Sequence, residues 1–368
     1  MGERRFLGGI EALRAYAAVA IILYHVVWIA GFDPPQALMV IKRHAAIGVP
    51  LFFAVSAFSL AFGYEDRLSG EGAVRDFYLR RLFRIAPLYY ASCLARIAVV
   101  LGPGWAISHP LDLALAATFT FNLSPAHVEG IALASWSIGV EMLFYLVFPA
   151  VIALARDLVS ALRLTLAAGV VAWLFALKTG EISGFVQHSI LFNLPYFGAG
   201  LVAYRLFQLR RDLPFWPLAG FTLGSALFLM WLVNPWAVAL TRAGDAAVYQ
   251  LWWTIPIAAA CLAMASNPSA LVSNPVTRWL GKVSFSLYLA HPYVIPVLNR
   301  SGVYAAIRDL PGGAGVTFIA ASLATIAATA LVSWPLYVFI EQPGQDFGRR
   351  YIQRLRARQA ADAQPRTA

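Results

Sequence analysis

Residues 10–31 read IEALRAYAAVAIILYHVVWIAG, a stretch long and apolar enough to cross a bilayer as one helix. Three polar side chains interrupt it, Glu11, Arg14 and His25, although such groups are costly inside a membrane. Arg14 and His25 lie three helical turns apart, so they share one face at depths that differ by roughly 16 Å. This polar stripe along a first membrane helix indicates a buried reaction site or a conduction path.

The composition of the whole chain agrees with a membrane protein. It is 60% hydrophobic and 12% charged, whereas soluble domains are about half apolar and a quarter charged. We therefore predict an all-α, polytopic transmembrane helix bundle. The ten expected spans are 9–30, 45–64, 82–101, 131–155, 162–178, 188–207, 216–234, 247–266, 283–300 and 314–340. The apolar stretch 111–123 is too short to cross and is expected to be re-entrant or interfacial.

The net charge of +10 is distributed over alternate loops and the C-terminal tail. This pattern fits the positive-inside bias of a multi-pass inner-membrane protein with both termini in the cytoplasm, rather than a nucleic-acid-binding protein. We expect a transmembrane domain over residues 1–344 and a basic cytoplasmic tail over 345–368 that lies as a helix along the membrane surface. Cys93 and Cys261 are expected to be buried thiols. The sequence shows no metal-ligand spacing and no glycine-rich phosphate-binding fingerprint.

A basic cluster enters the expected third span. Arg84 follows Arg80 by four residues and Arg81 by three, so the three side chains cluster on one helix surface. Guanidinium groups in such a cluster suit phosphates. The alternative is a basic collar that binds lipid headgroups and fixes the topology.

A second polar group opens the expected fourth span. Ser137, Glu141 and Tyr145 recur every four residues and share one face. Glu141 lies inside an apolar helix, where a carboxylate needs a partner, so it is expected to face the interior of the bundle. The alternatives are a structural hydrogen bond between helices and a functional role.

A third polar group opens the expected ninth span. Ser284, Tyr288 and His291 again lie on one face, and a packed polar seam is the simpler explanation for them. The remaining histidines carry less information. His44, His109 and His127 are expected to be solvated in outer or interfacial segments, and His188 has no recognisable context.

Taken together, these residues resemble the acyltransferase-3 family of polytopic membrane O-acyltransferases. Its ordered motifs match Glu11, Leu13, Arg14 and His25; Gly48 to Phe58; Arg81, Arg84 and Pro87; Trp136, Ser137, Glu141, Phe144, Tyr145 and Pro149; Gly281, Ser284, Tyr288, Leu289 and His291; and Glu341 and Pro343. Two positions depart from the pattern, because Ala57 replaces a glycine and Phe285 replaces a common tyrosine. The chain resembles the stand-alone form, without the periplasmic hydrolase-like domain of some relatives.

The resemblance implies transfer of an acyl group, commonly acetyl, from acyl-CoA to a hydroxyl of a carbohydrate or glycoconjugate. It implies catalytic roles for His25, as general base, and for Glu141 and Arg14. It also implies that donor phosphates bind a cationic cluster. The residues expected to bind the donor are Arg80, Arg81 and Arg84, and those expected at the substrate are Trp136, Ser137, Tyr288 and His291. No tightly bound cofactor, metal or nucleic acid is expected; the partners are acyl-CoA, the acceptor and the lipid bilayer.

Two other functional hypotheses are compatible with the same residues. A transporter or flippase would use His25, Glu141 and Arg14 as a proton relay or an anion path, although the sequence shows no inverted repeat. A catalytically silent membrane scaffold is the other reading. Within the enzyme reading, acetyl, succinyl and longer acyl groups are compatible, as are polysaccharide, lipopolysaccharide, lipid-linked sugar and glycosylated metabolite acceptors.

Overall fold

The computed structural model describes residues 7–179, 184–233 and 243–362, and every regular element in these ranges is helical. Eight helical runs in them are long and apolar enough to cross a membrane. Their main helices are α1 (Gly8–Trp28), α3 (Gly48–Tyr64), α4 (Ala73–Arg96), α7 (Trp136–Leu154), α8 (Leu158–Thr179), α10 (Ile190–Leu209), α12 (Ala243–Ser266) and α16 (Gly313–Leu336). Two further helices, α11 (Phe215–Val233) and α14 (Ser284–Arg300), lie where the other two spans were expected, and residue 234 lies outside the described ranges. The predicted all-α polytopic bundle is confirmed.

Short helices connect the spans. They are α2 (Met39–His44), α5 (Pro103–Ser108), α6 (Pro110–Thr118), α9 (Gly184–His188), α13 (Pro275–Lys282) and α15 (Val303–Arg308). α6 begins with Pro110 in its first turn and ends at Thr118, because the next residue, Phe119, has a φ of 59°. Its nine residues extend about 13 Å, less than half of the hydrocarbon thickness. The stretch 111–123 therefore does not cross, as predicted.

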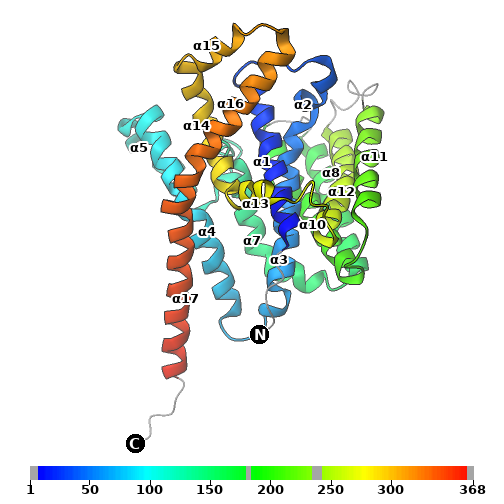
Figure 1. Cartoon of the computed structure of the whole chain (residues 1–368). Helices are drawn as coiled ribbons and strands as arrows, with labels where there is room; N and C mark the ends of the chain where they lie inside the picture. The colour runs from blue at the N-terminus through cyan, green and yellow to red at the C-terminus, as the bar shows by residue number, and fades with distance from the viewer. Residues whose placement is uncertain (1–6, 180–183, 234–242, 363–368) are drawn as a thin grey trace, which may run out of the picture.

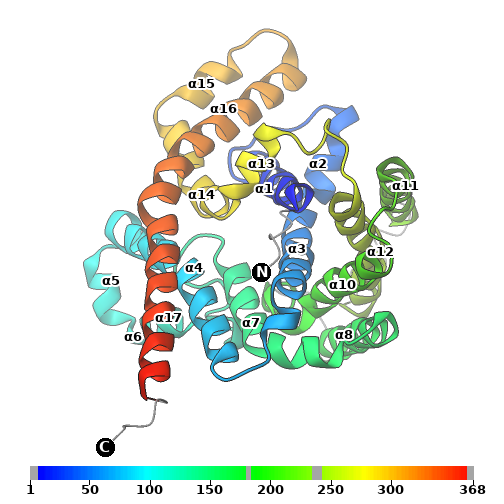
Figure 2. The same ribbon diagram turned by 60° about the horizontal axis from the view of Figure 1, so that its bottom comes forward.

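The bundle is built around α1 and α3. In Figure 2 these two helices lie inside a ring formed by α4, α7, α10, α12 and α14, with α8 and α11 farther out. Small residues allow the close approach of these helices, as is common in membrane proteins. A Cβ added to Gly200 in α10 would run into the carbonyl of Ala54 in α3, and one added to Gly281 in α13 would run into the carbonyl of Glu11 in α1.

The C-terminal helix is continuous with the last expected span and is not the separate surface helix that the sequence predicted for the tail. A π-helical segment, Tyr337–Glu341, joins α16 directly to α17 (Gln342–Asp362), which lies beside α4 (Figure 1). The buried carboxylate of Asp76 in α4 connects the two helices, because it pairs with Arg75 at 2.9 Å and with Arg356 of α17 at 2.5 Å. Residues 345–362 of the expected tail therefore continue the last span and pack on α4, and residues 363–368 lie outside the described ranges.

Candidate active site

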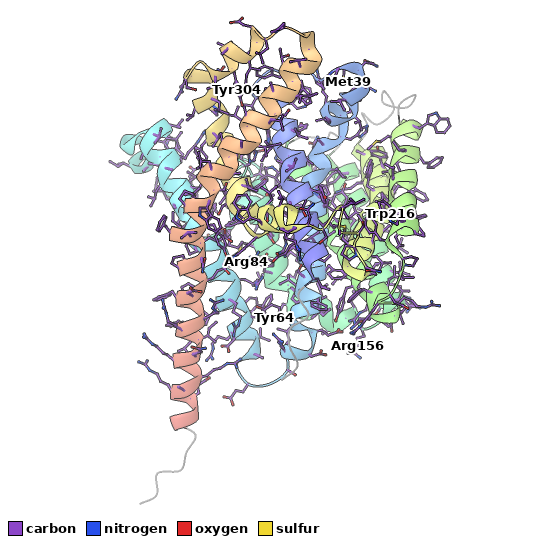
Figure 3. The ribbon with its side chains drawn as sticks, viewed as in Figure 1. Met39, Tyr64, Arg84, Arg156, Trp216 and Tyr304 are labelled. Carbon is purple, nitrogen blue, oxygen red and sulfur yellow. The ribbon has the colours of Figure 1, made fainter. Side chains whose placement is uncertain are left out.

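One cavity lies between α1, α3, α4, α7 and α14 and has about 720 Å³ of empty space, part of which is open to solvent. Three arginines face it, Arg14 from α1 and Arg81 and Arg84 from α4, so we call it the arginine cavity (Arg84 is labelled in Figure 3). Arg80, the third member of the expected cluster, is half-buried and is not part of the wall. The other polar residues of the wall are Ser56, Ser59, Ser137, Glu141, Tyr145, Ser284 and Tyr288.

The guanidinium groups of this cavity keep unused donors. Arg14 Nη2 donates to Ser59 Oγ at 3.0 Å, and Arg81 Nη2 donates to the Tyr64 hydroxyl at 3.0 Å. The Nε of Arg81 is buried without a hydrogen-bond partner. Arg84 makes no hydrogen bond or ion pair with any residue that the structure describes. Several cationic donors that face one space form a site suited to a phosphate or another anion.

Glu141 belongs to the arginine cavity. Ser56 Oγ donates to its carboxylate at 2.7 Å, and the Tyr145 hydroxyl from the next turn of α7 also hydrogen-bonds to it. A carboxylate among three cations lowers the cost of keeping them away from water. No contact between Glu141 and His25 is found among the described residues, because His25 lies in the wall of a different cavity.

The second cavity is larger, with about 1960 Å³ of space that opens to the outside. It is bounded by α1, α2, α3, α7, α9, α10, α12 and α14, and three histidines line it, so we call it the histidine cavity. These are His25, His44 and His188. Val49 and Tyr288 belong to the walls of both cavities, so the two spaces meet at these side chains.

His25 is paired with a second histidine. Its Nδ1 lies 2.8 Å from Nε2 of His291 in α14, and the two rings are stacked with centroids 4.9 Å apart. His291 is fully buried and lines neither cavity. His25 and His291 therefore meet across the bundle, but of the two only His25 lines one of the described cavities.

The histidine cavity contains residues that the sequence did not single out. His188 stacks on the ring of Trp136, with centroids 4.1 Å apart, and its Nδ1 lies 2.6 Å from Oε1 of Glu129. His44, expected to be solvated, forms part of the same wall. Glu129 and His188 come from separate connections that are 59 residues apart, so no local spacing links them in the sequence. One face of Trp136 is covered by His188 and is not open to a substrate.

Tyr288 connects the two cavities through hydrogen bonds. Its hydroxyl accepts from Ser137 Oγ at 2.8 Å and donates to the carbonyl of Ala134 at 2.7 Å. Both expected substrate-binding hydroxyls are therefore brought together at the common wall. Glu341, by contrast, lies outside both walls; its buried carboxylate accepts from Ser286 at 2.8 Å and holds α14 against the α16–α17 junction.

The chain is similar to known acyltransferases. A family model described as an acyltransferase domain matches residues 7–338. The chain is 25% identical to the acyltransferase MdmB of Streptomyces mycarofaciens over 92% of its own length and 91% of that protein. It is 26% identical to the exopolysaccharide production protein ExoZ of Rhizobium meliloti (strain 1021), over 81% and 89% of the two chains. No solved structure matches this chain.

In residues 7–179, 184–233 and 243–362, no group of three or more histidine, cysteine, aspartate or glutamate side chains could hold a metal ion. A space faced by three guanidinium groups adjoins a space that contains an imidazole, and hydrogen-bonded hydroxyls of Ser137 and Tyr288 lie at the wall between them.

Proposed function

Since the chain belongs to the acyltransferase family whose model matches residues 7–338, we propose that it transfers an acyl group, in the first instance acetyl, from a coenzyme A thioester to a hydroxyl of a carbohydrate or glycoconjugate. The observation that carries this proposal is the junction of the arginine cavity with the histidine cavity at Tyr288. A transfer reaction needs its two substrates to meet, and one of these spaces suits an anionic donor while the other contains a base.

The donor occupies the arginine cavity in this proposal. The phosphates of coenzyme A bind Arg81 and Arg84, whose guanidinium groups keep unused donors. Arg14 lies in the same wall, on the helix that also carries His25. The pantetheine arm then extends from the arginines toward Tyr288, which places the thioester at the junction of the two cavities.

The acceptor occupies the histidine cavity. Its wall combines aromatic rings, among them Trp253 and Tyr249, with the amides of Gln250 and Asn193. Flat apolar surfaces next to a few polar groups suit a sugar ring with its hydroxyls. The name of the relative ExoZ refers to exopolysaccharide production, which supports a carbohydrate acceptor.

His25 acts as the general base in this reaction. The acceptor oxygen forms a bond to the thioester carbonyl carbon while its proton passes to His25. The carbon–sulfur bond then breaks, and coenzyme A leaves as the thiolate. The hydroxyls of Ser137 and Tyr288 lie at the common wall, where Ser137 donates to Tyr288 and Tyr288 donates to the Ala134 carbonyl. In this proposal the Tyr288 hydroxyl turns from the Ala134 carbonyl to the thioester carbonyl oxygen as negative charge develops there.

The test uses the purified protein in proteoliposomes with radiolabelled acetyl-CoA and a panel of oligosaccharide and lipid-linked sugar acceptors. We expect release of coenzyme A together with label in one class of acceptor. The His25→Ala variant should retain acetyl-CoA binding but lose about 10²–10⁴-fold in turnover, the usual range for a positioned acid–base group.

His109→Ala is the matched control, because His109 stacks on Trp105 and lies outside both cavities. It should keep full turnover. Absence of acetyl-CoA binding by the wild-type protein would contradict the proposal. Acetyl-CoA-independent movement of an ion or a lipid-linked sugar across the same proteoliposomes would favour the transporter reading instead.

A further inference from the structure

The pairing of His25 with His291 has a direction that the hydrogen-bond partners determine. Nδ1 of His291 lies 3.3 Å from the carbonyl oxygen of Leu287, one turn earlier in α14. A carbonyl oxygen only accepts, so this nitrogen carries the proton of His291. A neutral imidazole has one donor and one acceptor, so Nε2 of His291 is an acceptor.

The tautomer of His25 follows from the same rule, that a neutral imidazole has one donor and one acceptor nitrogen. Its Nδ1 lies 2.8 Å from Nε2 of His291, and that nitrogen has no proton to donate. Nδ1 of His25 must therefore carry the proton, which leaves Nε2 of His25 with a free lone pair. His291 is fully buried and holds no substrate, whereas His25 lines the histidine cavity. The free lone pair therefore belongs to the ring that faces the acceptor space.

We propose that His291 is a positioning residue, which holds His25 in the tautomer whose Nε2 can accept the proton of the acceptor hydroxyl. This inference rests on the proposed function. A His25 with its proton on Nε2 would present a donor to the cavity and would not act as a base. In a serine protease, the wrong tautomer of a catalytic histidine costs about 10⁴ in kcat.

His291 also acts during the reaction. As the acceptor oxygen bonds to the thioester carbon and the carbon–sulfur bond breaks, Nε2 of His25 takes the hydroxyl proton. The resulting imidazolium keeps its Nδ1–H bond to the Nε2 lone pair of His291, which stabilises the positive charge. The proton does not travel farther, because Nδ1 of His291 is already bonded to the Leu287 carbonyl. Nε2 of His291, a neutral acceptor, thus stabilises the His25 imidazolium as a carboxylate would, and no charged side chain has to be buried beside it.

Two substitutions separate this role from simple packing. His291→Phe keeps a flat ring of similar size but removes the acceptor. We expect kcat to fall about 10²–10⁴-fold while the KM for acetyl-CoA and the amount of folded protein stay unchanged. His291→Gln offers a side-chain oxygen to Nδ1–H of His25, and we expect it to keep most of the wild-type kcat.

The tautomer itself is measured by ¹⁵N NMR of histidine-labelled protein in nanodiscs, with the His25 signals assigned from the His25→Ala spectrum. We expect protonated Nδ1 and unprotonated Nε2 in the wild type and in His291→Gln, and loss of this state in His291→Phe. A wild-type His25 protonated on Nε2 overturns the inference, and this measurement needs no variant at residue 291 to fold.

Failure of this inference is distinguishable from failure of the proposed function. An unchanged kcat and an unchanged His25 spectrum in His291→Phe overturn the positioning role but leave the acyltransferase activity intact. Full turnover by His25→Ala overturns the assignment of the base, and with it the role of His291, whatever the spectrum shows.

Discussion

Ser137 donates a 2.8 Å hydrogen bond to the hydroxyl of Tyr288, and the tyrosine forms part of the wall of both cavities. The chain of hydroxyls ends at the carbonyl of Ala134, whose φ of 59° lies in a region that alanine rarely adopts. The bent backbone at Ala134 thus holds the acceptor that orients Tyr288. The side chain at the junction of the two spaces is held by hydrogen bonds to Ser137, in the first turn of α7, and to Ala134, in the connection that precedes it.

Ser137 and Tyr288 are expected to act as a unit. Loss of one oxyanion donor costs about 10²–10³ in kcat, so Tyr288→Phe and Ser137→Ala should each lower turnover by that order. Because Ser137 orients Tyr288, the double variant should lose little more than the worse single one. Turnover of the four proteins in this double-mutant cycle measures the coupling. Tyr16→Phe, on the exposed side of α1, is the control, and fully additive losses would contradict coupling.

The arginine cavity should bind the phosphates of coenzyme A. Arg81→Ala and Arg84→Ala each remove a charged donor worth about 1.5–3 kcal/mol, so we expect roughly ten- to hundredfold weaker coenzyme A binding by isothermal titration calorimetry. Lysine at either position should restore only part of the affinity, because it lacks the planar fork. Arg80→Ala should bind normally, since Arg80 lies outside the wall. Equal losses of coenzyme A affinity in all three variants would contradict this site and would favour the alternative, a basic collar that fixes the topology.

Gly281 should be essential for the packing of α13 on α1. A methyl group at this position would run into the backbone carbonyl of Glu11, which cannot move aside as a side chain would. Overpacking of this kind costs about 1–3 kcal/mol, so Gly281→Ala should unfold at a lower temperature in a detergent thermal-shift assay. Gly220→Ala in α11 is the matched control, because nothing lies within 4 Å of its added Cβ. Equal melting temperatures would show that α13 can shift without cost.

The pairing of Asp76 with Arg356 should hold α17 on α4. Asp76→Ala removes a charge-assisted hydrogen bond from Arg356, whose strength is about 1.5 kcal/mol or more. Cleavage by trypsin within α17 should therefore become about tenfold faster. Asp346→Ala breaks an exposed pair with Arg349 inside the same helix and should have little effect. Unchanged cleavage of Asp76→Ala would assign the docking of α17 to Phe83, Phe347 and Tyr351 instead.

The bundle should be oriented with the end of α17 in the cytoplasm. α17 ends at the bottom of Figure 1, whereas α2 and α15 lie at its top. Since arginines concentrate in the loops expected inside, a reporter fused after residue 362 should be active only if it works in the cytoplasm. A reporter inserted at Pro311, between α15 and α16, should show the opposite behaviour. The same activity pattern at both sites would contradict the ten-span topology.

Some features of the site could be predicted because they depend on one helix alone. Helical periodicity places Ser137, Glu141 and Tyr145 on one face, and in the structure all three line the arginine cavity. The same rule relates Tyr288 to His291, yet it does not say that only Tyr288 reaches a cavity. A face of a helix is about a third of its circumference, so neighbouring residues on it differ in what they touch.

The class of fold follows from the amino-acid sequence alone, as do the side chains that are unusual within it. Apolar runs of membrane length leave few structures other than a helix bundle, because every backbone polar group in lipid needs an internal partner. Arg14, His25 and Glu141 stand out for the same reason, since each is costly in such a run. These conclusions need only the length and polarity of single segments.

Only the tertiary structure decided which of these groups meet. It pairs His25 with His291, 266 residues later, and His188 with Glu129, and it directs Glu141 to the arginines. The physical reason is that partners across helices depend on which faces dock and at what height. Close backbone contacts set that docking, such as the one between α10 and α3, where only a glycine fits against a carbonyl. Small residues are common throughout this chain, so no local pattern marks the few that make such contacts.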